Sequence, residues 1–327
     1  MNWLAHKINR ALFFRTPLGE ILSVLHSLYL HLRYSFSDRT PGKDKEKLRY
    51  YLVKHCHIVE KGLALPEPRP GFGQPKITGL VSKARGYEQQ FGQDDVTHML
   101  RDMLRAYLTF HQENNYALPT GFKSLIETFT AETVPAQKGG LKILQKEYWA
   151  QYSLDEFKRF LSCRHSVRDF SLVPVDDEKI KDAIKTSLNT PSVCNRQGWI
   201  VHYYNNKEEI KSLLAFQNGN AGFTECIDKL LIVTGNSKAF TRHEHNQLFV
   251  DGGLLSMNIM LSLHASGLGS CPLNTCMPFY KEEKLKSRAG IPKHEKLILM
   301  IAVGNLKDTF SVAQSKKYTV DEVFRGH

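Results

Sequence analysis

The sequence reads Arg164-His165-Ser166-Val167-Arg168 at the start of its C-terminal half, just before a helical pattern. Two guanidiniums, an imidazole and a hydroxyl at this spacing suit phosphate and polyol oxygens, because charged donors and bidentate guanidinium contacts fit such oxygens well. A basic surface turn that is ion-paired to Asp169 or Glu178 would have the same sequence. Alone, the stretch predicts an anion-binding segment or a paired turn.

A second polar stretch follows, Thr190-Pro191-Ser192-Val193-Cys194-Asn195-Arg196-Gln197-Gly198-Trp199. Its Ser192, Asn195 and Gln197 are short hydrogen-bonding side chains that suit the edge of a heterocycle, and Trp199 supplies an aromatic anchor. An Asx-rich turn between a helix and a strand would also place such residues here. Alone, this stretch leaves both interpretations open.

Length, charge and cysteine usage limit the class of protein. The 327 residues predict two units with buried cores. The net charge of +11 divides into +7 over residues 1–150 (21 Lys and Arg against 14 Asp and Glu) and +4 over the rest (23 against 19). This excess could attract phosphate-rich ligands, anionic membrane or nucleic acid, or be simply solvated. Six cysteines without CxxC or zinc spacing, and no secretory signal, predict reduced thiols, no metal site and a cytoplasmic location.

Residues 1–150 are expected to form a mostly helical unit. Apolar residues recur at helical spacing, whereas β-branched alternation is scarce. The expected helical segments are 2–40, 45–63, 77–91, 94–112 and 121–128. The prolines and glycines of 66–75 should form an ordered loop or a linker. Charges interrupt the first 40 residues too often for a membrane span, so a basic helix at a membrane surface and a helix packed on its own domain stay open.

Residues 151–327 are expected to mix strands and helices, which predicts an α+β or α/β unit. Ser153 and Glu156 form a capping-box pattern for a helix that ends near 162, and another helix begins near 176. Segments 199–204, 229–234 and 296–303 have the character of strands. Segment 249–266 is apolar nearly all round, as in a helix at the centre of a fold or at a subunit interface.

Four motifs in this order and spacing resemble the FMN-dependent nitroreductase family. They are Arg164-His165-Ser166-Val167-Arg168, Pro191-Ser192-Val193-Cys194-Asn195-Arg196-Gln197-Gly198-Trp199, Gly267-Leu268-Gly269-Ser270-Cys271 and Ala302-Val303-Gly304-Asn305. The resemblance covers residues 155–327. It implies an α+β fold with a central sheet flanked by helices, in an intertwined homodimer with FMN at the subunit interface.

The resemblance also implies the residues that hold the flavin. Arg164, His165, Ser166 and Arg168 would hold its phosphate, ribityl chain and pyrimidine edge. Pro191, Ser192, Val193 and Asn195 would face the flavin bound mainly by the other subunit. The backbone of Asn274 would run beside flavin N5, where a donor stabilises the reduced ring, so no side chain is expected to act as a catalytic group. The other implied contacts are Gln197, Asn220, Leu268, Gly269, Ser270, Pro272, Leu273, Lys316 and Lys317.

The sequence departs from the family pattern in three places. Lys316 or Lys317 must replace the usual C-terminal arginine, and lysine lacks the planar guanidinium fork. Gly198 stands where the family usually has proline. Asn220 is only a loose match to a contact with the flavin edge.

The implied activity is hydride transfer from NADPH or NADH, through bound FMN, to a small organic acceptor such as a nitro compound or quinone. A ping-pong scheme needs no separate nicotinamide domain, so the lack of a dinucleotide fingerprint is no difficulty. An alternative is an accessory or flavin-binding protein of a cell-surface polysaccharide pathway, whose helical extension docks a partner or a membrane. Nucleic-acid binding rests on charge alone, and no nucleic-acid partner is expected.

One motif of the N-terminal half resembles an extension of nitroreductase-like proteins linked to polysaccharide biosynthesis. It combines His57-Ile58-Val59-Glu60-Lys61-Gly62-Leu63 with Arg69-Pro70-Gly71-Phe72-Gly73. Charged residues and glycines at this density could form a second ligand site or a lid over the flavin. A helix C-cap followed by a proline-rich packing loop explains the motif equally well.

Overall fold

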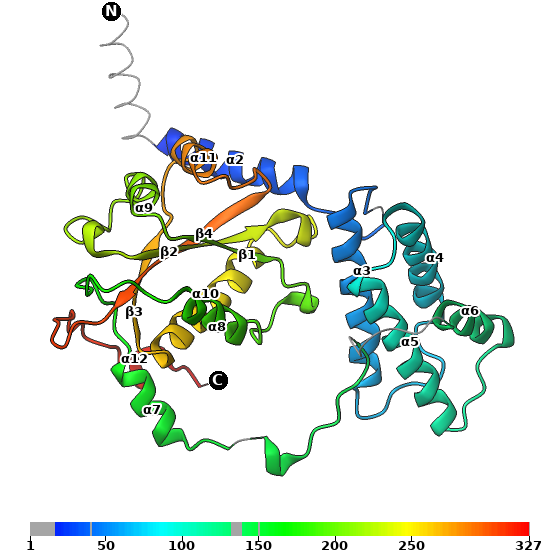
Figure 1. The fold of residues 1–327 in the computed structure, drawn as a ribbon. Coiled ribbons are helices and arrows are strands. Elements are labelled where there is room, and N and C mark those ends of the chain that lie inside the picture. The colour runs from blue at the N-terminus through cyan, green and yellow to red at the C-terminus, as the bar shows by residue number, and fades with distance from the viewer. Residues whose placement is uncertain (1–16, 40, 132–138, 150, 327) are drawn as a thin grey trace, which may run out of the picture.

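The computed structural model describes residues 17–39, 41–131, 139–149 and 151–326 (Figure 1). The first part of the helical pattern expected over 2–40 lies outside these residues. The class is α+β: helices come first along the chain, and an antiparallel sheet flanked by helices follows.

Four helices form a helical body that encloses its own core. They are α3 (Lys45–Leu63), α4 (Gln74–Phe91), α5 (Asp95–Glu113) and α6 (Thr120–Thr130). Two of these helices have side-chain N-caps. Asp44 accepts a hydrogen bond from the Lys47 amide at the start of α3, and Asp94 forms a capping box with Thr97 at the start of α5. Their apolar faces meet around fully buried residues such as Leu52 and Leu100. The predicted helices are confirmed, but α4 begins earlier, because Pro75 in a first turn needs no backbone donor.

Helix α2 (Pro17–Tyr34) lies outside the core of the helical body. It packs along the C-terminal half, beside α11 (Phe279–Arg288) and the 3-10 turn η4 (Ser237–Ala239). Figure 1 shows α2 and α11 together above the sheet. The helical extension is thus divided between a closed body and a helix that belongs, by its contacts, with the second half.

The C-terminal half is built on a four-stranded antiparallel sheet in the order β1-β2-β4-β3. Its strands are β1 (Trp199–Tyr204), β2 (Lys229–Asn236), β3 (Leu268–Asn274) and β4 (Glu295–Asn305). Strand β2 is buried throughout, and its successive side chains enter different cores. Leu230 and Ile232 join the core under α9 (Lys207–Leu214) and α11, whereas Leu231 and Val233 join the core under α8 (Asp177–Ser187) and α10 (Gln247–Ala265).

Helix α10 is the central helix of this domain. In the described part of the chain it is the one helix that is long and apolar enough to cross a membrane. Leu255, Ile259 and Leu263 are fully buried in the core between α10 and the sheet. The same helix leaves Phe249, Val250, Leu254 and Met257 exposed.

A long segment connects the two halves. It contains the 3-10 turn η1 (Lys146–Tyr148) and leads to α7 (Leu154–Cys163), whose predicted capping box between Ser153 and Glu156 is present. The segment is anchored where it leaves the helical body, because the Gly140 amide donates to Glu60 Oε1 at 3.0 Å. At the far end of the chain, the exposed tail carries only a short helix, α12 (Val320–Val323), among the described residues.

Candidate functional site

The stretch from Arg164 to Arg168 lies against edge strand β3. Ser166 forms an isolated parallel bridge with Ser270, and the Val167 amide donates to the Ser270 carbonyl at 3.0 Å. The structure therefore brings two of the sequence motifs, 164–168 and 268–274, side by side at one edge of the sheet.

Phe170 explains two glycines of the other motifs. A Cβ at Gly304 would lie 2.6 Å from Phe170 Cγ, and one at Gly269 would lie 3.0 Å from Phe170 Cε1. The phenyl ring thus crosses β3 and β4 where both lack side chains. This close approach fixes the end of the arginine-containing stretch on the sheet.

The cations of this stretch are not used in ion pairs within the described residues. Asp169 pairs with Lys307 (2.5 Å) and Glu178 with Lys181 (2.6 Å), so neither carboxylate neutralises Arg164 or Arg168. Arg164 is half-buried at the end of α7, and His165 and Arg168 are exposed. The alternative of an ion-paired turn therefore does not describe this segment. Two guanidiniums remain available to an anion beside β3.

The Pro191–Trp199 motif forms a tight loop around the 3-10 turn η2 (Val193–Asn195). Cys194, Asn195 and Gln197 all have φ near +50°. The Gln197 amide donates to Ser192 Oγ at 2.9 Å, which closes the loop on itself. The Val193 amide donates to the Asp251 carboxylate of α10 at 3.2–3.3 Å, and burial raises the pKa of that carboxyl. Predicted polar contacts Ser192, Asn195 and Gln197 are half-buried or exposed at the surface of this loop.

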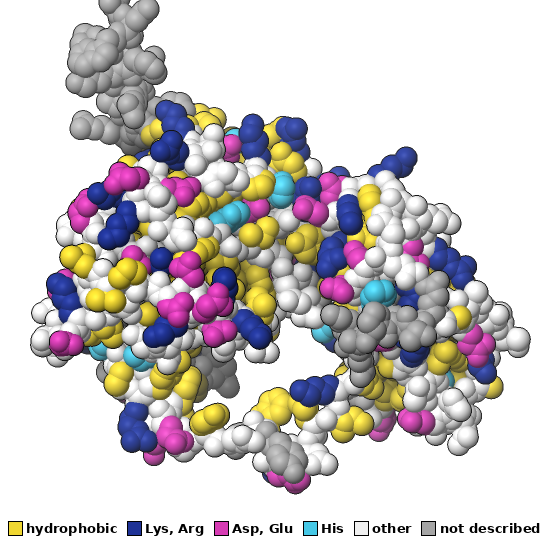
Figure 2. Space-filling model, in the orientation of Figure 1, with side chains coloured by type: hydrophobic (Ala, Val, Ile, Leu, Met, Phe, Trp, Pro, Cys, Tyr) yellow, Lys and Arg dark blue, Asp and Glu magenta, His cyan; other side chains and the backbone are white. Residues whose placement is uncertain are grey.

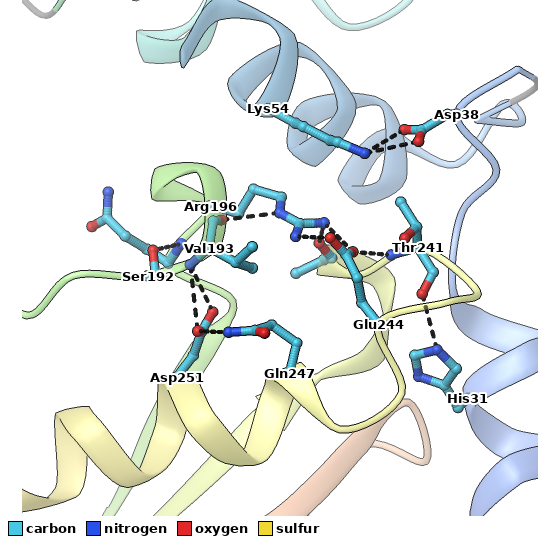
Figure 3. A network of polar contacts seen from close by, with 12 residues as sticks. His31, Asp38, Lys54, Ser192, Val193, Arg196, Thr241, Glu244, Gln247 and Asp251 are labelled. Carbon is cyan, nitrogen blue, oxygen red and sulfur yellow. Dashed lines mark hydrogen bonds and ion pairs between the residues drawn. The ribbon is translucent and has the colours of Figure 1, made fainter. Parts of the chain in front are cut away.

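Arg196, which the sequence interpretation did not single out, is the structural centre of the loop (Figure 3). Its fully buried guanidinium donates to both oxygens of Glu244 at 2.8 Å and to the Ala239 carbonyl at 2.7 Å. It also lies over the rings of Phe36 and Phe240. Burial acts to raise the pKa of Glu244, but the hydrogen bonds from Arg196 and Thr241 outweigh it and lower the pKa to about 2.

The same network connects the loop to the N-terminal helices. The Glu244 carboxylate also accepts from the Thr241 amide, and the Thr241 carbonyl contacts His31 Nε2 of α2 at 3.0 Å. Helix α3 packs against both η2 and η4. Gly198 permits this close packing, since a Cβ there would lie 2.5 Å from Ala239 Cβ. This contact accounts for glycine where the family pattern has proline.

The two groups of predicted flavin contacts lie at opposite ends of α10 within one chain. Val193 is bound to Asp251 near the start of the helix, whereas the Phe160 carbonyl, just before Arg164, contacts His264 Nε2 near its end. Thirteen residues of α-helix separate Asp251 from His264, or about 20 Å at 1.5 Å per residue. Within one chain, most of the length of α10 therefore separates the contacts that anchor the two groups to this helix.

Strand β3 contributes the other predicted residues. Leu268, Gly269, Ser270 and Leu273 are buried, Pro272 is half-buried, and Asn274 is exposed at the end of the strand. Gln217, which sequence reasoning missed, donates to the Asn274 carbonyl at 3.2 Å and so holds the neighbouring loop beside β3. The Asn220 side chain donates to Thr224 Oγ1 at 2.8 Å, which binds it within that loop. Its role as a flavin contact stays a prediction.

Lys316 and Lys317 lie on the exposed C-terminal tail. Lys316 pairs with Glu322 at 3.5 Å, within the tail itself. Their predicted contact with a phosphate stays a prediction. Within the described residues, no group of three or more His, Cys, Asp or Glu side chains could hold a metal ion, and all six cysteines are free.

The motif of the helical body is explained in part by packing. Glu60 accepts from the Gly140 amide and lies 3.4 Å from His57 Nδ1, and Ala64 caps α3 directly after Leu63. Gly62 leaves space for Phe72, whose ring would lie 2.4 Å from a Cβ at that position. Beside them, a cavity of about 240 Å³ is lined by residues that include Arg69 and Lys76. The expectation of a ligand site or lid here stays a prediction.

The C-terminal domain matches a known protein family. The fold and site define an α+β domain with free arginines at its edge strand. Residues 161–221 and 236–305 match the family model described as the nitroreductase family. The C-terminal half of the chain is therefore a nitroreductase family domain, and the helical region precedes it.

Individual relatives match the same half of the chain. A candidate NADH dehydrogenase/NAD(P)H nitroreductase of Archaeoglobus fulgidus is 24% identical over 162 residues, which are 47% of this chain and 88% of the relative. The candidate NAD(P)H nitroreductase YdgI of Bacillus subtilis is 21% identical over 192 residues, covering 47% of this chain and 90% of YdgI. Among solved structures, an FMN-dependent nitroreductase of Clostridium difficile has 19% identity and a TM-score of 0.45 over 51% of this chain and 98% of its own.

Proposed function

We propose that this protein is an NAD(P)H-dependent FMN oxidoreductase whose C-terminal domain binds the flavin. The observation that carries the proposal is the pair of arginines beside β3, which the nearby carboxylates leave free. The family match and the names of the relatives, which mention NAD(P)H and nitroreductase activity, support it. When bound, FMN would take hydride from NADPH or NADH and deliver it to a small organic acceptor.

The residues present fit a flavin mononucleotide. Arg164 and Arg168 would bind the phosphate, for which bidentate guanidinium contacts are well suited. His165 and Ser166 add donors for the ribityl chain and the pyrimidine edge. The backbone at Asn274 would supply an amide donor near N5, and Gln217 holds this strand end in place through the Asn274 carbonyl. The protein's contribution is thus binding, orientation and electrostatics.

We infer that the working unit is a homodimer with the flavin between subunits. The two groups of predicted contacts are anchored at positions about 20 Å apart along α10 of one chain, which supports a dimer in which a second copy supplies one group to each cofactor. Exposed apolar residues also follow the elements that a partner could cover: Leu154, Phe157 and Leu161 on α7; Phe249, Val250, Leu254 and Met257 on α10; Tyr318, Val320, Val323 and Phe324 on the tail. Such contiguous apolar surfaces are typical of subunit interfaces.

We place the protein in the cytoplasm, where NAD(P)H is available and the six free cysteines would stay reduced. A cytosolic fraction that lacks the protein, with the protein recovered from an extracytoplasmic fraction, would contradict this location.

The decisive experiment is the visible spectrum of the purified protein after addition of FMN, before and after NADPH or NADH under anaerobic conditions. Retained flavin bands that bleach with the nicotinamide are expected. No retained flavin would contradict the proposal.

Replacing Arg164 with alanine tests the assignment of the phosphate contact. We expect the dissociation constant of FMN to rise at least about tenfold, because a charged hydrogen bond contributes about 1.5–3 kcal/mol. Lys181→Ala is the matched control, since it removes a surface cation that Glu178 already neutralises. Equal FMN affinity in both variants would show that the phosphate lies elsewhere.

A further inference from the structure

Helix α2 turns a largely polar side toward the protein, where Ser23, His26 and His31 lie with the half-buried Leu30. Ser23 Oγ accepts from the Phe279 amide at 3.3 Å, and the His26 ring lies 4.8 Å from the Phe279 ring. His31 is buried and contacts the Thr241 carbonyl. A surface helix of a soluble protein normally buries its apolar side instead. The fixed orientation of α2 therefore presents its apolar side outward.

The outward side of α2 consists of large apolar residues that are 37–63% exposed. They are Leu18, Ile21, Val24, Leu25, Leu28, Tyr29 and Leu32. At 100° per residue they cover an arc of about 140°, along the whole length of the helix. A continuous apolar side of this size, left in water, indicates that another apolar medium covers it.

Cations lie close to this side, along with Glu20, the one acidic residue of α2. On the adjacent α11, Lys281 and Lys284 have no ion-pair partner in the described residues. Figure 2 shows Lys and Arg side chains among the apolar ones along the upper edge, where Figure 1 places α2 and α11. The sequence before α2 continues the mixture without any Asp or Glu: over residues 1–16 it contains Trp3, Phe13 and Phe14 together with Lys7, Arg10 and Arg15.

The width of the apolar side argues against a coiled coil with a second copy. A two-stranded seam uses a narrow row, here Leu18, Ile21, Leu25, Leu28 and Leu32, with charged residues on both flanks that set the pairing. The flanking positions of α2 instead carry Leu22, Val24 and Tyr29. A second copy would also bring the same basic neighbours into contact. A broad apolar side with basic borders is typical of a helix that lies in a membrane interface.

We propose that α2 docks the protein on an anionic membrane surface, with its apolar side in the boundary between headgroups and acyl chains and the cations of α11 near the lipid phosphates. This goes beyond the proposed flavin chemistry and does not depend on it. The C-terminal domain would be held at the membrane through the Ser23 and His31 contacts of α2.

Vesicle flotation of the full-length protein with FMN tests the proposal. We expect binding to phosphatidylcholine–phosphatidylglycerol vesicles, weaker binding to phosphatidylcholine alone, and release by salt, because the electrostatic part is screened. The double variant Leu25→Glu, Leu28→Glu should lower the partition coefficient at least about tenfold. Lys284→Gln should lower it about fivefold.

Leu65→Glu is the matched control, because Leu65 is similarly exposed but lies at the end of α3 in the helical body. It should bind vesicles like the parent protein. Circular dichroism and NAD(P)H-dependent flavin reduction of the double variant should be unchanged, which separates lost docking from lost folding or chemistry. Equal vesicle binding by parent and double variant would overturn the proposal. The proposal would also be overturned if the parent protein did not bind vesicles but self-associated through a contact that the double variant loses.

Discussion

The helical body and the C-terminal domain differ in how many large apolar side chains they leave exposed. Residues 45–130, all of them described, leave two large apolar side chains well exposed, Leu65 and Tyr116, around a core of their own. The C-terminal domain buries two faces of its sheet and still exposes apolar rows on α7, α10 and the tail. The body buries its apolar residues within one chain, whereas the exposed apolar rows of the C-terminal domain are of the kind that subunit interfaces cover. The residues predicted to bind the cofactor and the exposed apolar rows therefore belong to the same part of the molecule.

Introducing a charge into the exposed apolar row of α10 should have the largest effect of the substitutions considered. In a symmetric dimer Leu254→Asp places two carboxylates in the apolar contact, and we expect a loss of about 4 kcal/mol, roughly a thousandfold in the dimer dissociation constant. FMN should be released with the partner. Light scattering after size-exclusion chromatography, with absorbance of the flavin, measures both.

Leu65→Asp provides the matched substitution in the helical body, where it should change neither mass nor flavin content. A parent protein that is monomeric while it retains FMN would contradict the inference that a partner subunit completes the flavin site.

Removing Arg196 should be the next largest change, because this guanidinium joins the loop around η2 to Glu244 and to the Phe36 ring. Arg196→Ala leaves the Glu244 carboxylate without its partner, so we expect a loss of about 3–5 kcal/mol in the free energy of unfolding. Urea denaturation of the protein measures it. Arg196→Lys should recover part of the loss through a single charged contact. A loss below that of an ordinary surface substitution would show that the network is not a structural support.

The same variant should change the pH dependence of stability. The pKa of Glu244 is about 2 in the folded protein, below its ordinary value of 4.5, so its contribution is present above about pH 4.5 and is lost as the pH falls toward 2. The difference in unfolding free energy between parent and Arg196→Ala should therefore shrink over this interval. A difference in unfolding free energy that stays constant over this interval would show that the pKa of Glu244 is not lowered in the folded protein.

The smallest effect concerns the anchor between the two halves. Glu60→Ala removes the acceptor of the Gly140 amide, which should cost about 1.5 kcal/mol of stability and speed proteolysis between residues 141 and 152. Glu127→Ala on α6 is the control, since its exposed pair with Lys123 should contribute at most about 0.5 kcal/mol. Unchanged cleavage in Glu60→Ala would show that other contacts hold the segment.

Much of this architecture was predictable because its signals are local. Helical spacing located α3 to α6, and the Ser153–Glu156 pair located the start of α7. Strand β3 was missed because Gly269 and Pro272 are unfavourable in strands, and they occur here at an edge under Phe170. The inverted orientation of α2 and the role of Arg196 depend on contacts with distant residues, which spacing along the chain does not encode.

For the candidate site, the sequence identified the motifs and residue types but not the contacts that hold them in place. The family resemblance assigned the motifs 164–168 and 191–199 to flavin contacts from different subunits, and in the structure the bridge from Ser166 to Ser270 lies between 164–168 and β3. The separation of the two motifs along α10 arises from the packing of Val193 and Phe160 against opposite ends of that helix. Asp169 and Glu178 were the carboxylates that the sequence offered as partners of the arginines, and only the structure shows that they pair with Lys307 and Lys181 instead.

The loop around η2 also has a kinetic consequence. Cys194, Asn195 and Gln197 lie in left-handed backbone conformations, which cost of the order of 1–3 kcal/mol each when strained, although asparagine tolerates them best. Ser192, Asp251 and Glu244 hold the loop in this shape through hydrogen bonds within the protein. The conformational entropy of these residues is thus lost during protein folding. A cofactor that meets this loop should associate at a rate set by diffusion and charge, without waiting for the loop to rearrange.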